Sequence, residues 1–262
     1  MTFHLWGPFC FTMLQKGSVY VIIGNCHGPV ALMIMTETTP ILVAYEDMLK
    51  SGMHFGRKKT VFHPAMGKFV FTVRDGISIL DLLKTQEMLV QAVEFLRTKL
   101  ANAGLVLFVA PTKQSHDGIL ALAQALGMPY VLDRWLGGTL TNFKVINGRV
   151  KRLEAMELSK AKGELDKYTK KERLLFDREL QKMSKNFEGL KKLTRLPDAV
   201  FVASVKEGKL PIAEATTMKV PVVGIANTDA NPATVKVAIP ANDRSKISVD
   251  LVLKALEQEL AR

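Results

Sequence analysis

The feature that most constrains the fold is a regular alternation of short apolar runs with amphipathic stretches, which begins near Tyr45 and continues to the C-terminus. The runs expected to form strands are residues 69–73, 105–110, 130–133, 199–203, 221–225 and 237–239. Residues 105–110 are almost continuously apolar, as parallel strands are when helices bury both of their faces. The alternation therefore predicts a layered α/β domain with a mostly parallel sheet.

Two amphipathic helices are expected to cover this sheet. One spans residues 81–100 and the other follows Asn242-Asp243, and in both the apolar residues recur at helical spacing. The first apolar face consists of Leu83, Leu89, Val90, Val93, Leu96 and Leu100, and the second of Ile247, Leu251, Leu253, Leu256 and Leu260. These helices and the strands predict a core domain made of residues 45–143 and 196–262.

The alternation is interrupted by a charged segment, residues 144–195, which predicts two long helices. Thr169-Lys170-Lys171-Glu172 has the pattern of a capping box that opens the second helix. The apolar positions Phe176, Leu180, Met183, Phe187 and Leu190 repeat at alternating spacings of four and three, which predicts an inserted antiparallel coiled-coil hairpin. The segment contains 16 Lys or Arg and 8 Asp or Glu, so it supplies +8 of the net charge of +11. A solvated helical face usually balances its charges, and the excess therefore favours an interaction arm.

Residues 1–34, within a predicted N-terminal extension of residues 1–44, differ from the rest, because their Trp, Phe, Cys, Gly and His residues show no clear period. We expect an N-terminal extension that is either disordered or upstream of a natural start at Met35. Both cysteines, Cys10 and Cys26, lie in this segment, which favours a reducing, cytoplasmic location. No uninterrupted apolar run is long enough to cross a membrane, so no membrane association is expected.

The net charge of +11 and the pI near 9.6 favour a polyanionic partner, nucleic acid above all. An α/β enzyme acting on a phosphorylated or nucleotide substrate is the main alternative, and a coiled-coil adaptor or membrane-surface protein is a third. Residues 111–115, after a predicted strand, lack the glycines of a phosphate-binding loop, and no nucleophile elbow occurs. His54, His63 and His116 lack the spacing of metal ligands. No catalytic residue, metal site or cofactor is therefore predicted.

The strongest local signals are basic and aromatic. Between His54 and Arg74 the chain carries five positive charges and no carboxylate, as a phosphate-contacting segment would. Phe55 and Phe62 could stack on RNA bases or anchor the segment in the core. The run Arg134-Trp135-Leu136-Gly137-Gly138 combines a guanidinium, a large ring and a tight backbone directly before the predicted hairpin, although Trp135 could equally be a core anchor.

Several blocks in order resemble the bacterial small-subunit ribosomal protein two family, from about Glu46 to the C-terminus. They are His54-Phe55-Gly56, Arg74-x-Gly76-Ile77-x-Ile79-x-Asp81-Leu82, the run from Arg134 to Asn142, Thr169-Lys170-Lys171-Glu172, Leu196-Pro197-Asp198-Ala199, Asn227-Thr228-Asp229-x-Asn231-Pro232 and Ile239-Pro240-x-Asn242-Asp243. The sequence departs from the family pattern at Arg57, where the family usually has His, in Phe62-His63-Pro64-Ala65-Met66, and at Pro111 of Pro111-Thr112-Lys113.

The resemblance implies a flavodoxin-like α/β domain with a coiled-coil arm, docked between the head and body of the small ribosomal subunit. It implies binding to 16S-type ribosomal RNA and neighbouring ribosomal proteins, help in anchoring ribosomal protein one, no catalysis and no homo-oligomer. Together with the basic segments, it predicts RNA contacts at His54, Arg57, Lys58, Lys59, Lys68, Arg74, Lys113, Arg134, Trp135, Thr141, Asn142, Lys144, Arg149, Lys151 and Arg152.

Overall fold

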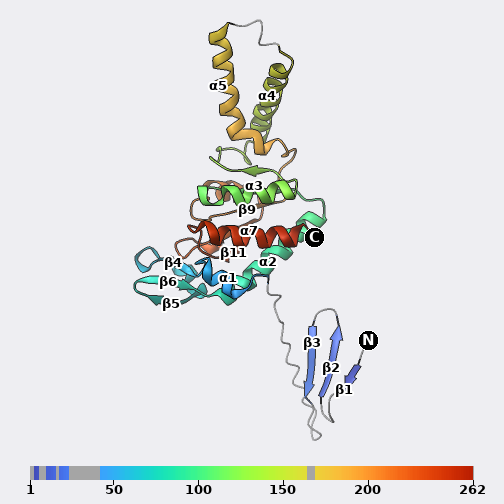
Figure 1. Ribbon diagram of the computed structural model, residues 1–262, viewed down its shortest axis with the longest axis vertical. Coiled ribbons are helices and arrows are strands. Elements are labelled where there is room, and N and C mark those ends of the chain that lie inside the picture. Colours follow the sequence, from blue (N-terminus) through green and yellow to red (C-terminus); the bar gives the residue numbers. More distant parts are fainter. Residues whose placement is uncertain (1–2, 6–9, 16–17, 24–41, 164–168, 262) are drawn as a thin grey trace. The chain divides into compact units, whose positions relative to one another are not determined.

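The computed structural model describes residues 3–5, 10–15, 18–23, 42–163 and 169–261. The chain divides into two compact units, Met1–Pro40 and Ile41–Arg262 (Figure 1). In the first unit, β1 (Phe3–Leu5), β2 (Cys10–Gln15) and β3 (Ser18–Ile23) form an antiparallel sheet in that order. The β-branched and aromatic residues of β2 and β3 favour strands, although their pattern was too weak to predict them. The proposed start at Met35 lies outside the described residues.

The second unit contains a five-stranded parallel sheet, which confirms the predicted fold class. Its strands are β7 (Val106–Val109), β8 (Tyr130–Val131), β9 (Ala199–Val202), β10 (Val222–Ala226) and β11 (Val237–Pro240). The order is β11-β10-β9-β7-β8, with every neighbouring pair parallel. This is the doubly wound, flavodoxin-like order, in which the first strand of the sheet lies between the second and the third.

Helices bury both faces of this sheet, and alternate residues of each strand enter different clusters. Val106 and Phe108 pack with α2 (Leu82–Ala101), α3 (His116–Ala125) and α7 (Lys246–Leu260), beside α1 (Tyr45–Lys50). Leu107 and Val109 pack with α6 (Lys209–Thr217) and the lower part of the charged hairpin. Figure 1 shows α3 and α7 lying next to each other across the first face. Both faces are therefore dry, which explains the continuously apolar strands.

Two expected core positions are exposed instead. Leu83, in the first turn of α2, and Ile247, in the first turn of α7, both face solvent. Each lies beside the residue that caps its helix: Asp81 accepts a hydrogen bond from the backbone N–H of Leu83, and Ser245 accepts one from that of Ser248. The first turn of each helix therefore starts at the edge of the core, and its apolar stripe reaches the sheet only one turn later.

A separate antiparallel sheet corrects the prediction for residues 69–73. Those residues form β5 (Val70–Arg74), which pairs with β6 (Ile77–Leu80) and not with the parallel sheet, and β6 pairs in turn with β4 (Phe55–Lys58). Asp75 and Gly76 connect β5 to β6, and both have positive φ, 51° and 74°. An Asp-Gly pair with this geometry makes the tight hairpin turn that forces the second strand to run antiparallel.

The charged segment forms α4 (Phe143–Ala161) and α5 (Lys170–Phe187), followed by a short 3-10 turn at Glu188–Leu190. The capping box at Thr169 and Glu172 is confirmed, because each side chain bonds the backbone N–H of the other residue. An ion pair of 2.8 Å between Arg152 and Glu179 joins the two helices, and Phe187 is buried in the core. Residues 164–168 lie outside the described part, and the coiled-coil packing stays a prediction.

Candidate nucleic-acid interface

The antiparallel sheet brings three of the expected RNA contacts together. Lys58 of β4 and Arg74 of β5 both lie opposite Ile77 of the central strand β6, so the three side chains share one face of the sheet. Lys59 follows directly, and its backbone N–H donates to Gly76 O at 2.8 Å. We call Lys58, Lys59 and Arg74 the basic sheet end. All three are exposed and none makes an ion pair with another residue of the described part.

Apolar side chains on the same face adjoin the basic sheet end. Phe55 lies opposite Ile79, two positions along β6 from Ile77; Phe55 is 48% exposed and Ile77 is 37% exposed. The other face of β6 is different, since Ser78 and Leu80 are buried there. Lys68, in the 3-10 helix Pro64–Phe69, is also exposed, and its ammonium lies 4.8 Å from the centroid of the Phe69 ring. The outward face thus combines positive charge with apolar surface.

Arg57 and His54 have internal partners, unlike the basic sheet end. Arg57 Nε lies 3.6 Å from Asp229 Oδ2, with the two side chains 29% and 6% exposed, and its backbone N–H donates to Thr228 Oγ1 at 2.8 Å. His54 stacks obliquely on Phe55 with 4.1 Å between the ring centroids, and burial lowers its pKa, so the ring is neutral near pH 7. Arg57 therefore holds β4 against the residues after β10, and the contact of either residue with RNA stays a prediction.

Gly56 has a steric role between these two residues. A Cβ added there would lie 2.6 Å from Thr228 Cγ2 and 2.7 Å from Ser78 O. The backbone of β4 approaches the residues after β10 so closely that only glycine fits. The His54-Phe55-Gly56 block is thus explained by the packing of the antiparallel sheet against the carboxyl end of the parallel one.

The Trp135 segment is organised by a carboxylate that no sequence motif indicated, that of Glu214 on α6. Its Oε1 accepts from Trp135 Nε1 and from the backbone N–H of Gly138, both at 2.9 Å. Its Oε2 accepts from the backbone N–H of Leu140 at 3.0 Å, with longer contacts to the N–H and hydroxyl of Thr141. Trp135 and Thr141, both expected to contact RNA, therefore use their donors inside the protein.

These hydrogen bonds also set the charge of Glu214. Partial burial by itself would raise the pKa of this carboxyl, but the bonds from Trp135, Leu140, Gly138 and Thr141 outweigh burial and lower the pKa below its ordinary value. Glu214 is therefore ionised at neutral pH. Its partners lie 73 to 79 positions away in the sequence, and no local pattern around a single Glu in an apolar helix indicates them.

The remaining predicted contacts lie on two other parts of the unit. Lys113 and Arg134 are exposed just after β7 and β8, and because these strands are parallel neighbours, both residues lie at the carboxyl edge of the sheet. Asn142 is the N-cap residue of α4, and Lys144, Arg149 and Lys151 are exposed on that helix with no ion-pair partner among the described residues. Arg152 differs from them, since it pairs with Glu179. The predicted contacts thus lie on several different elements of the unit.

Buried polar residues in the last two blocks hold strand ends together. Asp243 is buried and accepts from Ser204 Oγ at 2.7 Å and from Asn227 Nδ2 at 2.9 Å. It therefore connects the segments that follow β9, β10 and β11, while Ser245 caps α7. Neither acid–base chemistry nor metal binding is needed to explain this network, and the described residues contain no group of three or more His, Cys, Asp or Glu that could hold a metal ion.

None of the helices in the described part of the chain is long and apolar enough to cross a membrane. In a comparison with protein-family models, residues 48–262 match the model described as Ribosomal protein S2. The matched range includes the parallel sheet, the antiparallel sheet and both helices of the charged segment, and it leaves out β1, β2 and β3.

Proposed function

Because the chain belongs to the ribosomal protein S2 family, it is a structural component of the small ribosomal subunit, and we propose that it binds ribosomal RNA there through exposed basic residues. The observation that carries this proposal is the basic sheet end, Lys58, Lys59 and Arg74, which has no neutralising ion pair within the described residues. Unpaired cations on a rigid sheet can replace the counterions of a phosphate backbone without first giving up an internal carboxylate partner.

The expected RNA contacts fall into two groups according to their partners. Lys144, Arg149 and Lys151 on α4 are exposed and unpaired too, and Lys68, Lys113 and Arg134 are exposed as well. Arg57 differs because its guanidinium lies beside Asp229, and bringing it to a phosphate would leave a buried carboxylate unpaired. Phosphate contacts from the unpaired residues would fix the orientation of the domain on the RNA.

We also propose that the protein docks between the head and body of the subunit and helps to anchor ribosomal protein one. What supports this is the family membership and the +8 excess on residues 144–195, which suits an arm between RNA elements. The alternative of an α/β enzyme gains no support from the family, which is a structural one. Subunits assembled with and without the full chain would test the anchoring, since retention of ribosomal protein one should depend on the chain's presence.

The RNA contact is tested by exchanging charge at the basic sheet end. The double variant Lys58→Glu and Lys59→Glu should weaken binding of the full chain to small-subunit RNA. Its logarithmic salt dependence should become shallower by about 0.7 to 0.9 for each phosphate that the variant no longer neutralises. Filter binding across a salt series measures both quantities, and sucrose-gradient sedimentation shows whether the variant still enters small subunits.

A charge-matched control is the pair Lys219→Glu and Lys254→Glu, exposed on the α6–β10 connection and on α7. These changes alter the net charge equally but lie on other elements, so a general electrostatic effect would appear in both variants. Equal salt slopes for the sheet variant, the control and the unchanged chain would show that the basic sheet end does not contact RNA.

A further inference from the structure

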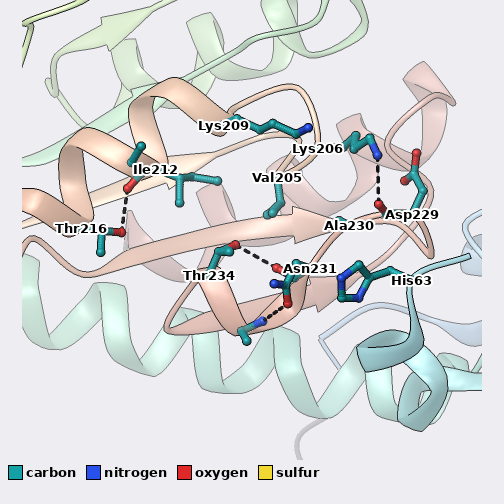
Figure 2. Close-up of a pocket in the computed structure, with 12 residues that line it drawn as sticks. His63, Val205, Lys206, Lys209, Ile212, Thr216, Asp229, Ala230, Asn231 and Thr234 are labelled. Carbon is teal, nitrogen blue, oxygen red and sulfur yellow. Dashed lines mark hydrogen bonds between the residues drawn. The ribbon is translucent and has the colours of Figure 1, made fainter.

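A pocket of about 660 Å³ opens at the carboxyl edge of the parallel sheet, beside the strands β9 and β10. Its walls are the segment after β9, one side of α6 along its length, the residues after β10 with the 3-10 helix Pro232–Thr234, and His63 (Figure 2). The carboxyl edge of a doubly wound sheet is where such folds bind ligands. None of the RNA contacts proposed above lines this pocket.

One end of the pocket offers hydrogen-bond donors and positive charge. Lys206 and Lys209 lie close together there in Figure 2, and Lys209 has no hydrogen-bond or ion-pair partner among the described residues. His63 Nδ1 accepts from the backbone N–H of Ala65 at 3.2 Å, so the proton of the neutral ring is on Nε2, which can donate. The amide group of Asn231, whose Oδ1 accepts from the N–H of Ala233, is a further donor, but it lies beside Thr234 and not at this end (Figure 2). This end suits an anion.

The nearby carboxylate does not reverse this conclusion. Asp229 also lines the pocket, but its Oδ2 lies 3.6 Å from Arg57 Nε and its side chain is only 6% exposed. Lys206 donates to the backbone oxygen of Asp229 at 3.3 Å, and Figure 2 shows the two residues together at one side. The negative charge is therefore compensated by Arg57, while the charges of Lys206 and Lys209 have no carboxylate partner in the described residues.

The opposite end offers acceptors. Thr216 Oγ1 donates to Ile212 O at 2.8 Å, and Thr234 Oγ1 donates to Asn231 O at 2.8 Å. Since each hydroxyl proton is committed to the backbone, each oxygen presents its lone pairs to a ligand. In Figure 2 these threonines lie on the side away from Lys206. Between the two ends the lining is apolar, with Val205, Ile212 and Ala230 almost completely buried beneath it.

We propose that this pocket binds a single nucleotide unit. The phosphate lies by Lys206 and Lys209, the flat base covers the apolar surface of Val205 and Ile212, and an exocyclic amine donates to Thr216 or Thr234. A base with an amino group explains acceptors at the far end, which an inorganic anion or a short acidic side chain would leave unused. The unit is either a free nucleotide or a base splayed out of an RNA strand, the form in which proteins read RNA sequence.

Calorimetric titration of the full chain tests the ligand class with three probes: adenosine monophosphate, inosine monophosphate and inorganic phosphate. Adenosine monophosphate should bind more tightly than inosine monophosphate, which carries a carbonyl in place of the amine, and more tightly than phosphate. Ala213→Trp, which fills the pocket from an exposed position of α6, and Lys209→Glu should each weaken binding by about tenfold or more.

Matched controls separate the pocket from general effects. Ala125→Trp places the same ring at the exposed end of α3, and Lys254→Glu reverses an exposed charge on α7. Neither should change the affinity for adenosine monophosphate. Equal affinity for the nucleotide and for phosphate would overturn the base site, and nucleotide binding that Ala213→Trp leaves unchanged would place the ligand elsewhere and overturn the assignment.

Photo-crosslinking in assembled small subunits distinguishes the two sources of the nucleotide. A cross-link from RNA to residues 205–216 or 230–234 would identify an RNA base as the occupant; binding of free nucleotide without such a cross-link would identify a free one. Absence of both results would overturn the proposal. Ala213→Trp should still sediment with small subunits, because the basic sheet end is unaltered, so failure of the pocket proposal is distinguishable from failure of the RNA-binding proposal.

Discussion

Replacing Glu214 by Gln tests whether one carboxylate holds the Trp135 segment in place. The change keeps the shape of the side chain but turns one acceptor oxygen into a donor amide that must face a backbone N–H. With Oε1 serving Trp135 and Gly138 and Oε2 serving Leu140, either orientation of the amide breaks at least one bond, and the rest no longer have the assistance of the negative charge.

The loss of stability expected in Glu214→Gln follows from these hydrogen bonds. Hydrogen bonds to a charged group contribute roughly 1.5 to 3 kcal/mol and neutral ones about 1 kcal/mol, and an unpaired buried donor costs about 1 to 3 kcal/mol. Glu214 is only partly buried, so water can take the place of some of its partners, and we take the lower part of these ranges. We expect Glu214→Gln to destabilise the segment by about 2 kcal/mol, which is roughly a thirtyfold change in its opening equilibrium.

Amide hydrogen exchange at Gly138 and Leu140 measures this local opening directly, and the indole N–H of Trp135 reports the third bond. The control is Glu207→Gln, close to the same helix, where an exposed ion pair of 3.2 Å with Arg244 should matter little. If Gly138 and Leu140 exchange in Glu214→Gln at the same rate as in the unchanged protein and in the control, the carboxylate does not organise this segment.

The same carboxylate predicts a pH dependence with a definite sign. The pKa of Glu214 is lower in the folded chain than its ordinary value of 4.5. Its contribution to stability is therefore complete above pH 4.5 and is lost as the pH falls through the lower folded-state pKa. Protection of the Gly138 and Leu140 amides should decrease over that acidic window in the unchanged protein. In Glu214→Gln this part of the pH dependence should disappear, and its persistence would assign the effect to another group.

Two further predictions concern packing. Gly56→Ala should lower the free energy of unfolding in urea by about 1 to 3 kcal/mol, because the added Cβ would meet atoms at 2.6 and 2.7 Å. Gly67→Ala is the control, since the nearest neighbour of its Cβ would be a ring carbon at 3.9 Å, and it should change the stability little. Equal losses of stability in the two variants would contradict the steric explanation. Phe187→Ala should cost about 3 to 5 kcal/mol, since its ring is buried in the core shared with the sheet. Leu180→Ala, higher on α5 and only partly buried, should loosen the hairpin helices alone, as proteolysis would show.

The elements predicted correctly are those whose burial is recorded in the pattern of their own consecutive residues. The five parallel strands were visible because burial on both faces makes them continuously apolar, and α2 because its apolar residues recur with a helical period. Residues 69–73 carried the same kind of signal, yet their sheet was decided by the two residues that follow β5. Asp75 and Gly76 both adopt positive φ and turn the chain back, so turn chemistry and not strand propensity set the topology.

The candidate site was harder to predict, because the sequence does not show which charged side chains already have an ion-pair partner inside the protein. Arg57 and Lys58 are adjacent and equally basic, but Arg57 points to Asp229, 172 positions later, while Lys58 faces solvent beside Ile77. Trp135 likewise donates to Glu214 across 79 positions. Only the fold brings such partners together, and a cation or donor with an internal partner must give up that partner to bind RNA. The distinction between paired and unpaired groups, and not the density of basic residues, is therefore what should separate the residues that hold this protein together from those that hold it on the ribosome.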